Sequence, residues 1–283
     1  MRLWVGTRDR GRLVEPADAT VSVLDHGFTV ADGVFETLKV TSAGPFALSR
    51  HLRRLGRSAA ALGLPAPVES VVRSAVAEVV GTVDRAVDAD PATSWRLRIT
   101  YTGGPAPLGS ERGDTPPTLV VAMAPGRRWP STSTAVTVPW ARNERSPLVG
   151  VKSTSYAENV VALAHAHAAG ASEALLSNSR DELCEGTGSN VFVVVGGRAL
   201  TPPLDSGCLP GVTRELVLEW FGAAEADLPM RVLAEADEVF LTSSTRDVHP
   251  LVRVDSRTWP TAGPVAARLR AEFAARAAAD IDP

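Results

Sequence analysis

The sequence predicts a protein of two α/β domains. Its 283 residues suffice for two medium-sized domains, each with a core of its own. Strand-like alternation and amphipathic, helix-like segments occur in both halves of the chain. Between the halves, residues 125–131 lose this periodicity and contain Pro and Gly. We therefore expect a smaller N-terminal domain over residues 1–124, a linker over residues 125–131 and a larger C-terminal domain over residues 132–283.

The expected strands of the first domain are short and separated by turns. They lie at residues 3–6, 20–24, 34–40, 94–102 and 118–122. In the third of these, side chains alternate as in a strand that is buried on one face. Phe35, Thr37 and Lys39 point to one side of it, and Glu36 points to the other.

Two helices are expected in the first domain, at residues 49–61 and 68–80. The first has an apolar stripe at spacings of three and four, which is typical of a helix packed on a core. Beside that stripe runs a polar one, made of His51, Arg54 and Ser58. A guanidinium in such a place usually meets a fixed anion or a carboxylate.

The second domain is expected to begin with a strand at residues 135–138. Ser155 and Glu158 have the spacing of a capping box, which predicts that the next helix begins there and ends near residue 169. Later elements follow in order. Strands are expected at residues 174–177, 183–185, 190–195 and 238–242, and helices at residues 214–221 and 265–278.

Charge and composition argue against several classes of function. A net charge of −3 does not suit a general nucleic-acid-binding surface. No uninterrupted apolar run approaches membrane-spanning length, and the charged start of the chain is unlike a secretory signal. The two cysteines, Cys184 and Cys208, and the five scattered histidines form no metal-binding pattern. We expect a cytoplasmic protein with reduced thiols and no metal.

Lysine usage singles out one position. Lys39 and Lys152 are the only lysines, whereas the chain has 29 Lys and Arg residues together. An amine can lose its proton and act as a nucleophile or base, or form a Schiff base with a carbonyl, whereas a guanidinium stays charged. Lys152 is therefore a candidate catalytic residue, although a surface lysine is the simpler alternative.

Three further features have the character of anion sites. Pro210-Gly211-Val212-Thr213 leads into a helix, where free main-chain N–H groups and a hydroxyl gather. Three hydroxyl residues follow a strand at residues 243–245. Arg54 is the third candidate. Each is commonplace alone, and neither GxxxxGK nor a GxGxxG after a strand is present. Glu185, at the end of a short strand, is either a turn residue or a partner for a protonated ring nitrogen.

Seven stretches of the chain form a recognisable series of motifs. They are Asp32-Gly33-Val34-Phe35-Glu36-Thr37, His51-Leu52-Arg53-Arg54-Leu55, Val151-Lys152-Ser153, Glu185-Gly186-Thr187-Gly188-Ser189-Asn190-Val191-Phe192, Thr201-Pro202-Pro203, Leu209-Pro210-Gly211-Val212-Thr213-Arg214 and Asp237-Glu238-Val239-Phe240-Leu241-Thr242-Ser243-Ser244. In this order and spacing they resemble class IV pyridoxal-phosphate enzymes of fold type IV. The family comprises branched-chain aminotransferases, D-amino-acid aminotransferases and 4-amino-4-deoxychorismate lyases. The resemblance implies pyridoxal 5′-phosphate, an amino-acid-like substrate and a homodimer whose loops border the partner's site.

The resemblance also implies a role for each matched residue. Lys152 would form the Schiff base with the cofactor and transfer the Cα proton, and Glu185 would keep the pyridine nitrogen protonated. Leu209 would pack on the ring face. The phosphate would be held by Arg54, Val212, Thr213, Ser243 and Ser244.

The motifs do not point to one of these three groups as clearly as they point to the family. The loop at residues 103–109 lacks the Arg and His of D-amino-acid aminotransferases, and also the arginine that many of the lyases have there. Glu36 fits branched-chain aminotransferases, but Thr37 replaces their usual Gly, and Ala157 their usual Tyr. Thr37 matches a threonine implicated in proton transfer in aminodeoxychorismate lyases, although it is also an ordinary strand residue.

The favoured function is therefore a lyase that converts 4-amino-4-deoxychorismate to 4-aminobenzoate and pyruvate, in folate biosynthesis. Lys152 and Thr37 would be its catalytic residues, and Arg98 or Arg246 would bind the substrate carboxylate. The alternative is a class IV aminotransferase acting on branched-chain or other amino acids with a 2-oxo acid. A third possibility is a binding protein that keeps the fold without the chemistry.

Overall fold

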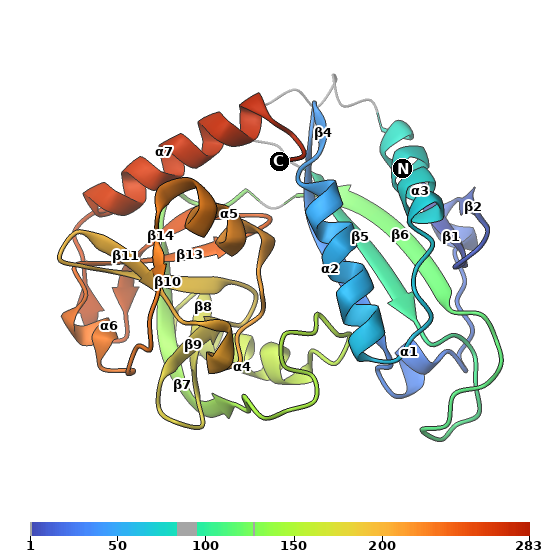
Figure 1. Ribbon diagram of the computed structural model, residues 1–283, viewed down its shortest axis with the longest axis horizontal. Helices are drawn as coiled ribbons and strands as arrows, with labels where there is room; N and C mark the ends of the chain where they lie inside the picture. Colours follow the sequence, from blue (N-terminus) through green and yellow to red (C-terminus); the bar gives the residue numbers. More distant parts are fainter. Residues whose placement is uncertain (1, 84–94, 127) are drawn as a thin grey trace. The chain divides into compact units, whose positions relative to one another are not determined.

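The computed structural model describes residues 2–83, 95–126 and 128–283. Ser94, at the start of a predicted strand, and Arg127, in the predicted linker, lie outside the described residues. The chain divides into two compact units, shown in Figure 1. The first comprises Met1–Arg128, Val151–Ser155 and Ile281–Pro283, and the second comprises Trp129–Gly150 and Tyr156–Asp280.

The first unit contains a six-stranded antiparallel sheet in the order β2-β1-β6-β5-β3-β4. Its strands are β1 (Leu3–Thr7), β2 (Gly11–Val14), β3 (Gly33–Thr41), β4 (Gly44–Pro45), β5 (Trp95–Thr102) and β6 (Thr118–Pro125). Along β3, Glu36, Leu38 and Val40 are buried, whereas Thr37 and Lys39 are half-buried. This is the alternation that the sequence predicts for a strand with one covered face.

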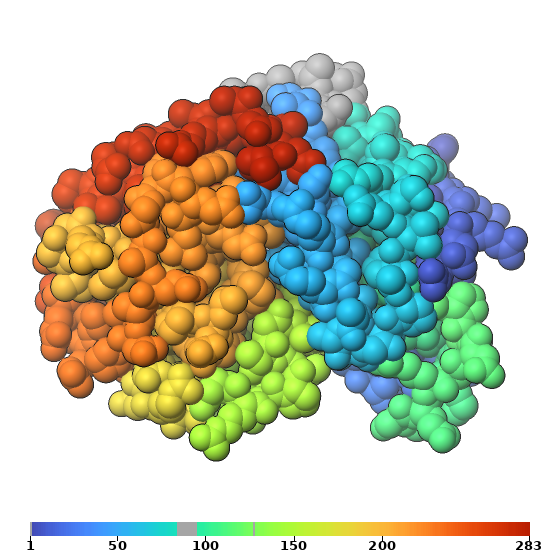
Figure 2. Space-filling model, in the orientation of Figure 1, coloured from blue at the N-terminus to red at the C-terminus, as the bar shows by residue number. Residues whose placement is uncertain are grey.

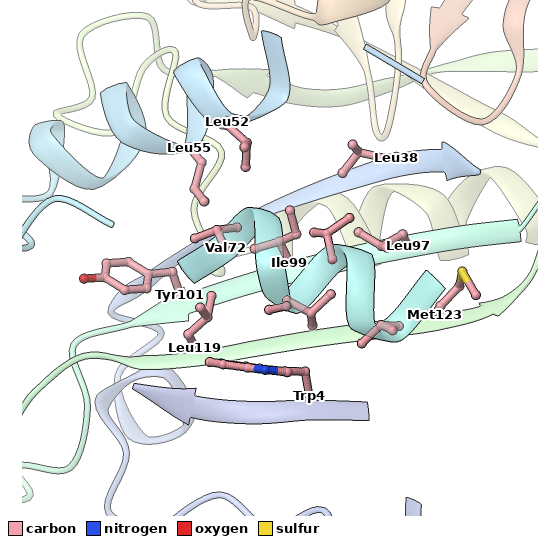
Figure 3. Packing of buried hydrophobic residues seen from close by; sticks show 14 of the residues in the cluster. Trp4, Leu38, Leu52, Leu55, Val72, Leu97, Ile99, Tyr101, Leu119 and Met123 are labelled. Atoms are coloured by element: carbon pink, nitrogen blue, oxygen red, sulfur yellow. The ribbon is translucent and has the colours of Figure 1, made fainter. Parts of the chain in front are cut away.

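Helices cover one face of this sheet and close its core. They are α2 (Leu48–Ala61) and α3 (Glu69–Gly81), with the short η1 (Pro16–Asp18) and α1 (His26–Thr29) elsewhere in the unit. Leu52 and Leu55 of α2 and Val72 of α3 pack in one cluster with Leu38 and Ile99 of the sheet, as Figure 3 shows. Figure 2 shows the outer sides of both helices at the surface.

The segment Val151–Ser155 belongs to the first unit because it pairs with β3. The Phe35 N–H donates to the main-chain oxygen of Lys152 at 2.9 Å, and the Thr154 N–H donates to that of Gly33 at 2.8 Å. The predicted boundaries put residues 151–155 in the second domain. The structure differs here because strand pairing, which joins residues distant in sequence, attaches this segment to the first sheet.

The second unit contains a nine-stranded mixed sheet in the order β12-β11-β10-β13-β14-β7-β8-β9, with β15 paired to β14. Its strands are β7 (Ser133–Arg142), β8 (Glu173–Asn178), β9 (Leu183–Gly186), β10 (Asn190–Val195), β11 (Arg198–Thr201), β12 (Ala224–Glu225), β13 (Glu238–Ser243), β14 (Asp247–Val254) and β15 (Arg257–Thr258). Strand β7 runs parallel to both neighbours, and β11 runs parallel to β12. The pairs β8–β9 and β10–β13 are antiparallel.

The helices of the second unit are α4 (Ala157–Ala168), α5 (Val212–Phe221), α6 (Val232–Glu235) and α7 (Pro264–Ala279), with η2 (Leu204–Ser206). Helix α4 packs on β7 and β8, and α7 packs mainly on β14. The buried side of α7 carries Ala266, Leu269 and Phe273, and its outer side is the red ridge of Figure 2.

Two predicted features are corrected by the structure. Residues 20–24 form no strand, and Val21, Val23 and Leu24 remain exposed because no neighbouring strand pairs with them. The predicted capping box of Ser155 and Glu158 is also not formed, since the N-cap of α4 is Tyr156, which makes no side-chain cap hydrogen bond. Within the part of the chain that the structure describes, the helices are too short or too polar to cross a membrane.

Candidate active site

Lys152 lies at the edge of the first unit's sheet, against the ring of Phe35. Its Nζ atom is 4.4 Å from the centre of that ring. Its main-chain oxygen accepts the Phe35 N–H, and its own N–H donates to the Oγ atom of Ser58 on α2 at 3.3 Å. Strand pairing and this contact with α2 therefore fix the backbone from which the amine extends.

The face of β3 that carries Phe35 also carries Thr37, and β5 brings Arg98 to it. Arg98 is the direct partner of Thr37 in the antiparallel register. Its guanidinium carbon is 3.7 Å from the centre of the Phe35 ring. The ring thus contacts two cations, Arg98 and Lys152, a favourable arrangement for an aromatic face. Three predicted residues, Lys152, Thr37 and Arg98, gather around this face.

On the other side of β3, α2 directs His51 and Arg54 onto Glu36. The Nε and Nη2 atoms of Arg54 donate to the two carboxylate oxygens of Glu36 at 2.8 and 2.6 Å. The Nδ1 atom of His51 lies 2.6 Å from Oε2 of Glu36. All three side chains are buried. Two nitrogens of Arg54 therefore donate to a carboxylate inside the unit. Its contact with a phosphate stays a prediction.

Burial and charge set the protonation of this cluster. Burial alone would raise the pKa of Glu36, but the guanidinium of Arg54 and then His51 offset it and lower this pKa to about 2. Burial lowers the pKa of His51, with Glu36 acting in the opposite direction. Glu36 is thus ionised and His51 neutral at neutral pH, so the Nδ1–H of His51 donates to the carboxylate.

In the second unit, Glu185 lies near the end of β9. Pairing with Leu176 of β8 fixes its backbone. Its Oε2 atom accepts the main-chain N–H of Leu209 at 2.9 Å, and its Oε1 atom lies 3.2 Å from the Nε atom of Arg142. A carboxylate between a main-chain donor and a guanidinium is stabilised in its ionised form. The Glu185 carboxylate can therefore accept a hydrogen bond from a protonated ring nitrogen.

Sequence reasoning missed Arg142, the last residue of β7. Its Nη1 atom donates to Oδ1 of Asn159 at 3.2 Å, and Asn159 donates to the main-chain oxygen of Thr187. The register between β7 and β8 shifts between Thr137 and Ala141, just before Arg142. Such irregularities redirect side chains beside functional sites. Nothing in the sequence distinguishes Arg142 from the other arginines.

The loop before α5 is tied to β10. The Nδ2 atom of Asn190 donates to the main-chain oxygen of Leu209 at 2.8 Å. A Cβ atom on Gly211 would come within 2.0 Å of Oδ1 of Asn190, so this approach requires glycine. Gly211 is the N-cap of α5 and supplies no side-chain cap. The main-chain N–H groups of Val212 and Thr213 in the first turn are therefore suited to an anion.

The end of β13 carries the predicted hydroxyls. Thr242 pairs with Asn190, so the end of this strand lies beside the strand that holds the α5 loop. The hydroxyl oxygens of Thr242 and Ser243 are buried, and neither has a hydrogen-bond partner among the described residues. A buried hydroxyl without a partner is costly, which suits a place where a ligand oxygen binds. Ser244 follows directly.

Arg246 is engaged within the second unit. Its Nη2 atom lies 2.7 Å from Oε2 of the fully buried Glu173, and its guanidinium stacks 4.2 Å from the ring of Trp129. Glu173 also accepts from the main-chain N–H of Thr187 at 3.0 Å. Arg246 thus balances a buried carboxylate. Arg98 is exposed on β5, and its Nε atom donates to the hydroxyl of Thr100 at 3.1 Å.

The family model described as amino-transferase class IV matches residues 33–254. This range covers most of the chain, including every residue predicted for the site. The chain belongs to the class IV aminotransferase family. It is therefore a pyridoxal-phosphate-dependent enzyme, with the two-domain α/β architecture of fold type IV.

Curated class IV relatives are named as aminotransferases. A putative branched-chain-amino-acid aminotransferase from Methanocaldococcus jannaschii is 31% identical over 256 residues, 87% of each chain. A D-alanine aminotransferase from Bacillus licheniformis is 30% identical over 262 residues, 90% of each chain. These two names agree on the reaction type and differ in the amino acid.

Solved structures of similar proteins agree with the fold. A fold IV transaminase from Curtobacterium pusillum has a TM-score of 0.86 at 30% identity, with 98% of both chains covered. A hypothetical aminotransferase from Mycobacterium tuberculosis, solved in a PLP-bound form, has a TM-score of 0.80 at 26% identity over 96% of this chain and 99% of that one. A putative 4-amino-4-deoxychorismate lyase from Legionella pneumophila, 24% identical over 92% and 96% of the chains, shares the fold with a TM-score of 0.82.

The second unit of this class IV protein fits the cofactor chemically. Glu185 offers an ionised carboxylate for a protonated pyridine nitrogen. The start of α5 and the buried Ser243 hydroxyl offer donors of the kind that a phosphate accepts. A carboxylate, main-chain N–H donors and a hydroxyl thus occur together in this unit, and they suit the pyridine nitrogen and the phosphate of this cofactor.

Proposed function

We propose that this chain is an aminotransferase that exchanges an amino group between an amino acid and a 2-oxo acid. The position of Lys152 carries the proposal. Its amine is held against Phe35 by a backbone fixed at two points, and Arg98 flanks the same ring. A lysine whose backbone is fixed, and whose amine is at the end of a long side chain, can bind a carbonyl carbon and then move a proton.

Bound pyridoxal phosphate supplies an aldehyde for amines and a ring that withdraws electrons from the substrate's Cα. Lys152 would bind this aldehyde until the amine of the substrate displaces it. The freed Nζ atom would then take the proton from the substrate's Cα, carry it as an ammonium group and release it again to the reacting molecule. Glu185 would accept a hydrogen bond from the ring nitrogen and keep it protonated. Leu209 would pack on the ring face. The phosphate would be bound by Arg54, Val212, Thr213, Ser243 and Ser244.

Substrate recognition is assigned to Arg98. Its guanidinium stacks on Phe35 beside Lys152, so a carboxylate paired with it would lie close to the reacting amine. Arg246 is the weaker candidate because it already pairs with Glu173. Thr37, opposite Arg98 in the register, would line the same space.

The relatives favour the aminotransferase over the lyase that the sequence alone favours. Two curated relatives, at 31% and 30% identity, have aminotransferase names. The lyase-named structure, at 24% identity, supports the fold alone. One observation keeps the lyase as the second candidate: Thr37 lies on the face that carries Phe35, where its hydroxyl would be available for proton delivery.

The reaction type is tested by supplying the holoenzyme with two kinds of substrate. One assay pairs L-branched-chain amino acids or D-alanine with 2-oxoglutarate and measures the new oxo acid. The other supplies 4-amino-4-deoxychorismate and measures pyruvate. We expect oxo acid in the first assay and no pyruvate in the second. Pyruvate release without transamination would overturn the proposal in favour of the lyase.

We also propose a homodimer. Val23, Phe28 and Leu108 are each more than 70% exposed, in two segments joined by main-chain bonds at Leu24 and His26. Clustered exposed apolar side chains usually mark an interaction surface, and a second copy of the chain is the proposed partner. Light scattering should give about twice the mass of one chain, and Phe28→Ser should shift the protein toward monomer.

A further inference from the structure

We propose that Asp282 and Arg112 are positioning residues that clamp α2 at its two ends and so hold Arg54 and the Lys152 backbone in place. The inference rests on the proposed function, in which Lys152 reacts and Arg54 meets the cofactor phosphate. Both clamping residues come from segments far from α2 in sequence, and all the contacts lie within the first unit.

Helix α2 begins without a cap of its own. Its N-cap residue is Ala47, which has the left-handed φ of 54° and no side-chain bond. The cap is supplied by the chain's last residues. The carboxylate of Asp282 accepts the Ser49 N–H at 2.8 Å and the Ser49 hydroxyl at 2.5 Å. The Ala47 N–H donates to the main-chain oxygen of Ile281 at 2.7 Å.

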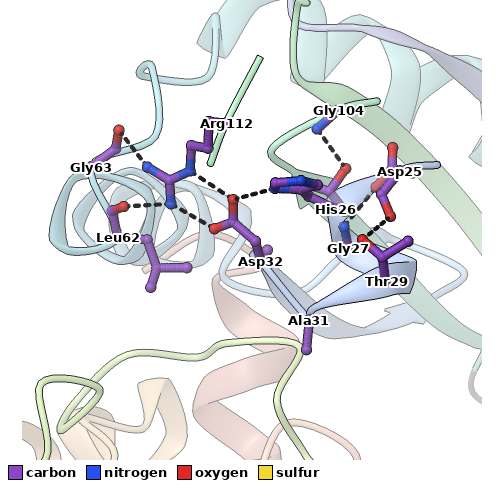
Figure 4. Close-up of polar contacts among 12 residues, drawn as sticks. Asp25, His26, Gly27, Thr29, Ala31, Asp32, Leu62, Gly63, Gly104 and Arg112 are labelled. Carbon is purple, nitrogen blue, oxygen red and sulfur yellow. Dashed lines mark hydrogen bonds and ion pairs between the residues drawn. The ribbon is translucent and has the colours of Figure 1, made fainter. Parts of the chain in front are cut away.

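The opposite end of α2 is held by Arg112, as Figure 4 shows. Its Nη2 atom donates to the main-chain oxygen of Leu62 at 2.7 Å, and its Nη1 atom donates to that of Gly63 at 3.1 Å. The same guanidinium forms a two-point pair with Asp32, both contacts being 2.6 Å. Asp32 immediately precedes β3, so Arg112 ties the end of the helix to the start of that strand.

The charges of Asp282 and Arg112 are opposite in sign to the partial charges at the ends of α2 that they contact. The N-terminus of a helix has a partial positive charge and attracts the anionic Asp282, whereas the C-terminus attracts the cationic Arg112. Capping contacts also satisfy main-chain groups that the helix itself leaves without partners. The clamp therefore opposes fraying at both ends of a 14-residue helix.

Movement of α2 would displace two parts of the proposed site together. Arg54 of this helix makes its two-point contact with Glu36 of β3. Ser58, one turn further, accepts the N–H of Lys152. A bidentate pair tolerates little sliding, so a helix fixed relative to β3 keeps both groups in register.

The test compares Asp282→Ala, Asp282→Asn, Arg112→Met and the double variant with two controls. Arg53→Gln removes an exposed charge from the middle of α2, and Asp114→Asn removes one from the segment that carries Arg112. Three quantities are measured in each protein. They are hydrogen exchange of the α2 amides without added cofactor, the dissociation constant of pyridoxal phosphate, and the ³¹P chemical shift of the bound cofactor.

We expect each single clamp variant to exchange α2 amides faster and to bind pyridoxal phosphate about two- to five-fold more weakly, the range that the loss of one cap supports. The ³¹P shift should move, Asp282→Asn should be intermediate because one acceptor remains, and the controls should match wild type. Unchanged α2 exchange would overturn the clamp. Faster α2 exchange with an unchanged dissociation constant and ³¹P shift would overturn the positioning role. If wild type binds no cofactor, the proposed function fails, and α2 exchange still decides whether the clamp exists.

Discussion

Arg142 places its Nε atom 3.2 Å from the Oε1 atom of Glu185, the carboxylate that we propose for the cofactor's ring nitrogen. The other Glu185 oxygen accepts the Leu209 N–H, so both oxygens face positive or donor groups. The guanidinium balances the charge of this carboxylate and, together with the Leu209 N–H, fixes its orientation. We infer that Arg142 is a positioning residue that acts through Glu185.

Replacing Arg142 by Gln should therefore weaken catalysis more than cofactor binding. Without the guanidinium, Glu185 loses the contact that orients its Oε1 atom. We expect kcat to fall about tenfold, which corresponds to about 1.4 kcal/mol in the activation barrier. The absorbance of the bound cofactor and the ¹⁵N shift of its ring nitrogen should change as well. Arg145→Gln, three residues away and exposed, is the control. Equal kcat values for both variants would contradict the role.

The two lysines allow a matched test of the cofactor attachment. Borohydride reduction of the holoenzyme should fix the cofactor on Lys152, and mass spectrometry of peptides should locate it there. Lys152→Ala should no longer be labelled. Its kcat should fall about 100- to 10,000-fold, which is the usual contribution of a proton-transferring group to the rate. Lys39→Ala removes the other lysine amine, on the same sheet, and should keep both the label on Lys152 and the kcat of the wild type. A label on Lys39 in wild type would refute the assignment.

Glu36→Gln should destabilise the fold and flatten its acid dependence. Removing one member of a buried ion pair costs about 3–5 kcal/mol, because Arg54 keeps a buried charge without its partner. The folded-state pKa of about 2 lies below the ordinary value of 4.5, so protonation favours the unfolded chain. This stabilisation is complete above pH 4.5 and is lost as the pH falls toward 2. Urea unfolding between pH 7 and 3 measures it.

The control for Glu36 is a surface pair. Glu69 and Arg73 form an exposed contact one turn apart on α3. Glu69→Gln should cost less than about 1 kcal/mol, because solvent screens exposed charges. If Glu36→Gln cost no more than this variant, the buried cluster would contribute nothing special to stability.

Neither cysteine should react with a thiol reagent in the native protein at pH 8. Burial raises the pKa of Cys184 strongly and that of Cys208 to about 11, so both stay as unreactive thiols. Both should react within minutes once the chain is unfolded in guanidinium chloride. Rapid reaction of one thiol before unfolding would contradict the burial described for these residues.

Local periodicity predicted elements whose pattern matches their burial. Strand β3 and helix α2 were found because one covered face leaves a repeat of two or of three to four residues in the chain. Strand β14 has no such repeat, since Val248, His249, Pro250 and Leu251 are all buried. Residues 20–24 have the alternation of a strand, but alternation cannot supply a partner strand, and their side chains stay exposed.

The site divides in the same way. The lysine count and the existence of a helix after Gly211 are local features and could be predicted, although the helix begins at Val212, two residues before the predicted start. The two-point pair of Arg54 with Glu36 joins positions 18 residues apart, and the contact of Arg142 with Glu185 depends on a register shift between β7 and β8. Contacts of this kind result from tertiary packing. They leave no periodic pattern in the sequence from which they could be predicted.

The pairing of Val151–Ser155 with β3 has a consequence for how this protein can be divided. The chain enters and leaves the first unit more than once, so no single uninterrupted gene fragment encodes either unit in full. A fragment beginning at Trp129 would contain Lys152 but not the strand that holds its backbone. Exchange of whole units between related enzymes, in the laboratory or in evolution, must therefore carry β3 and the lysine segment together.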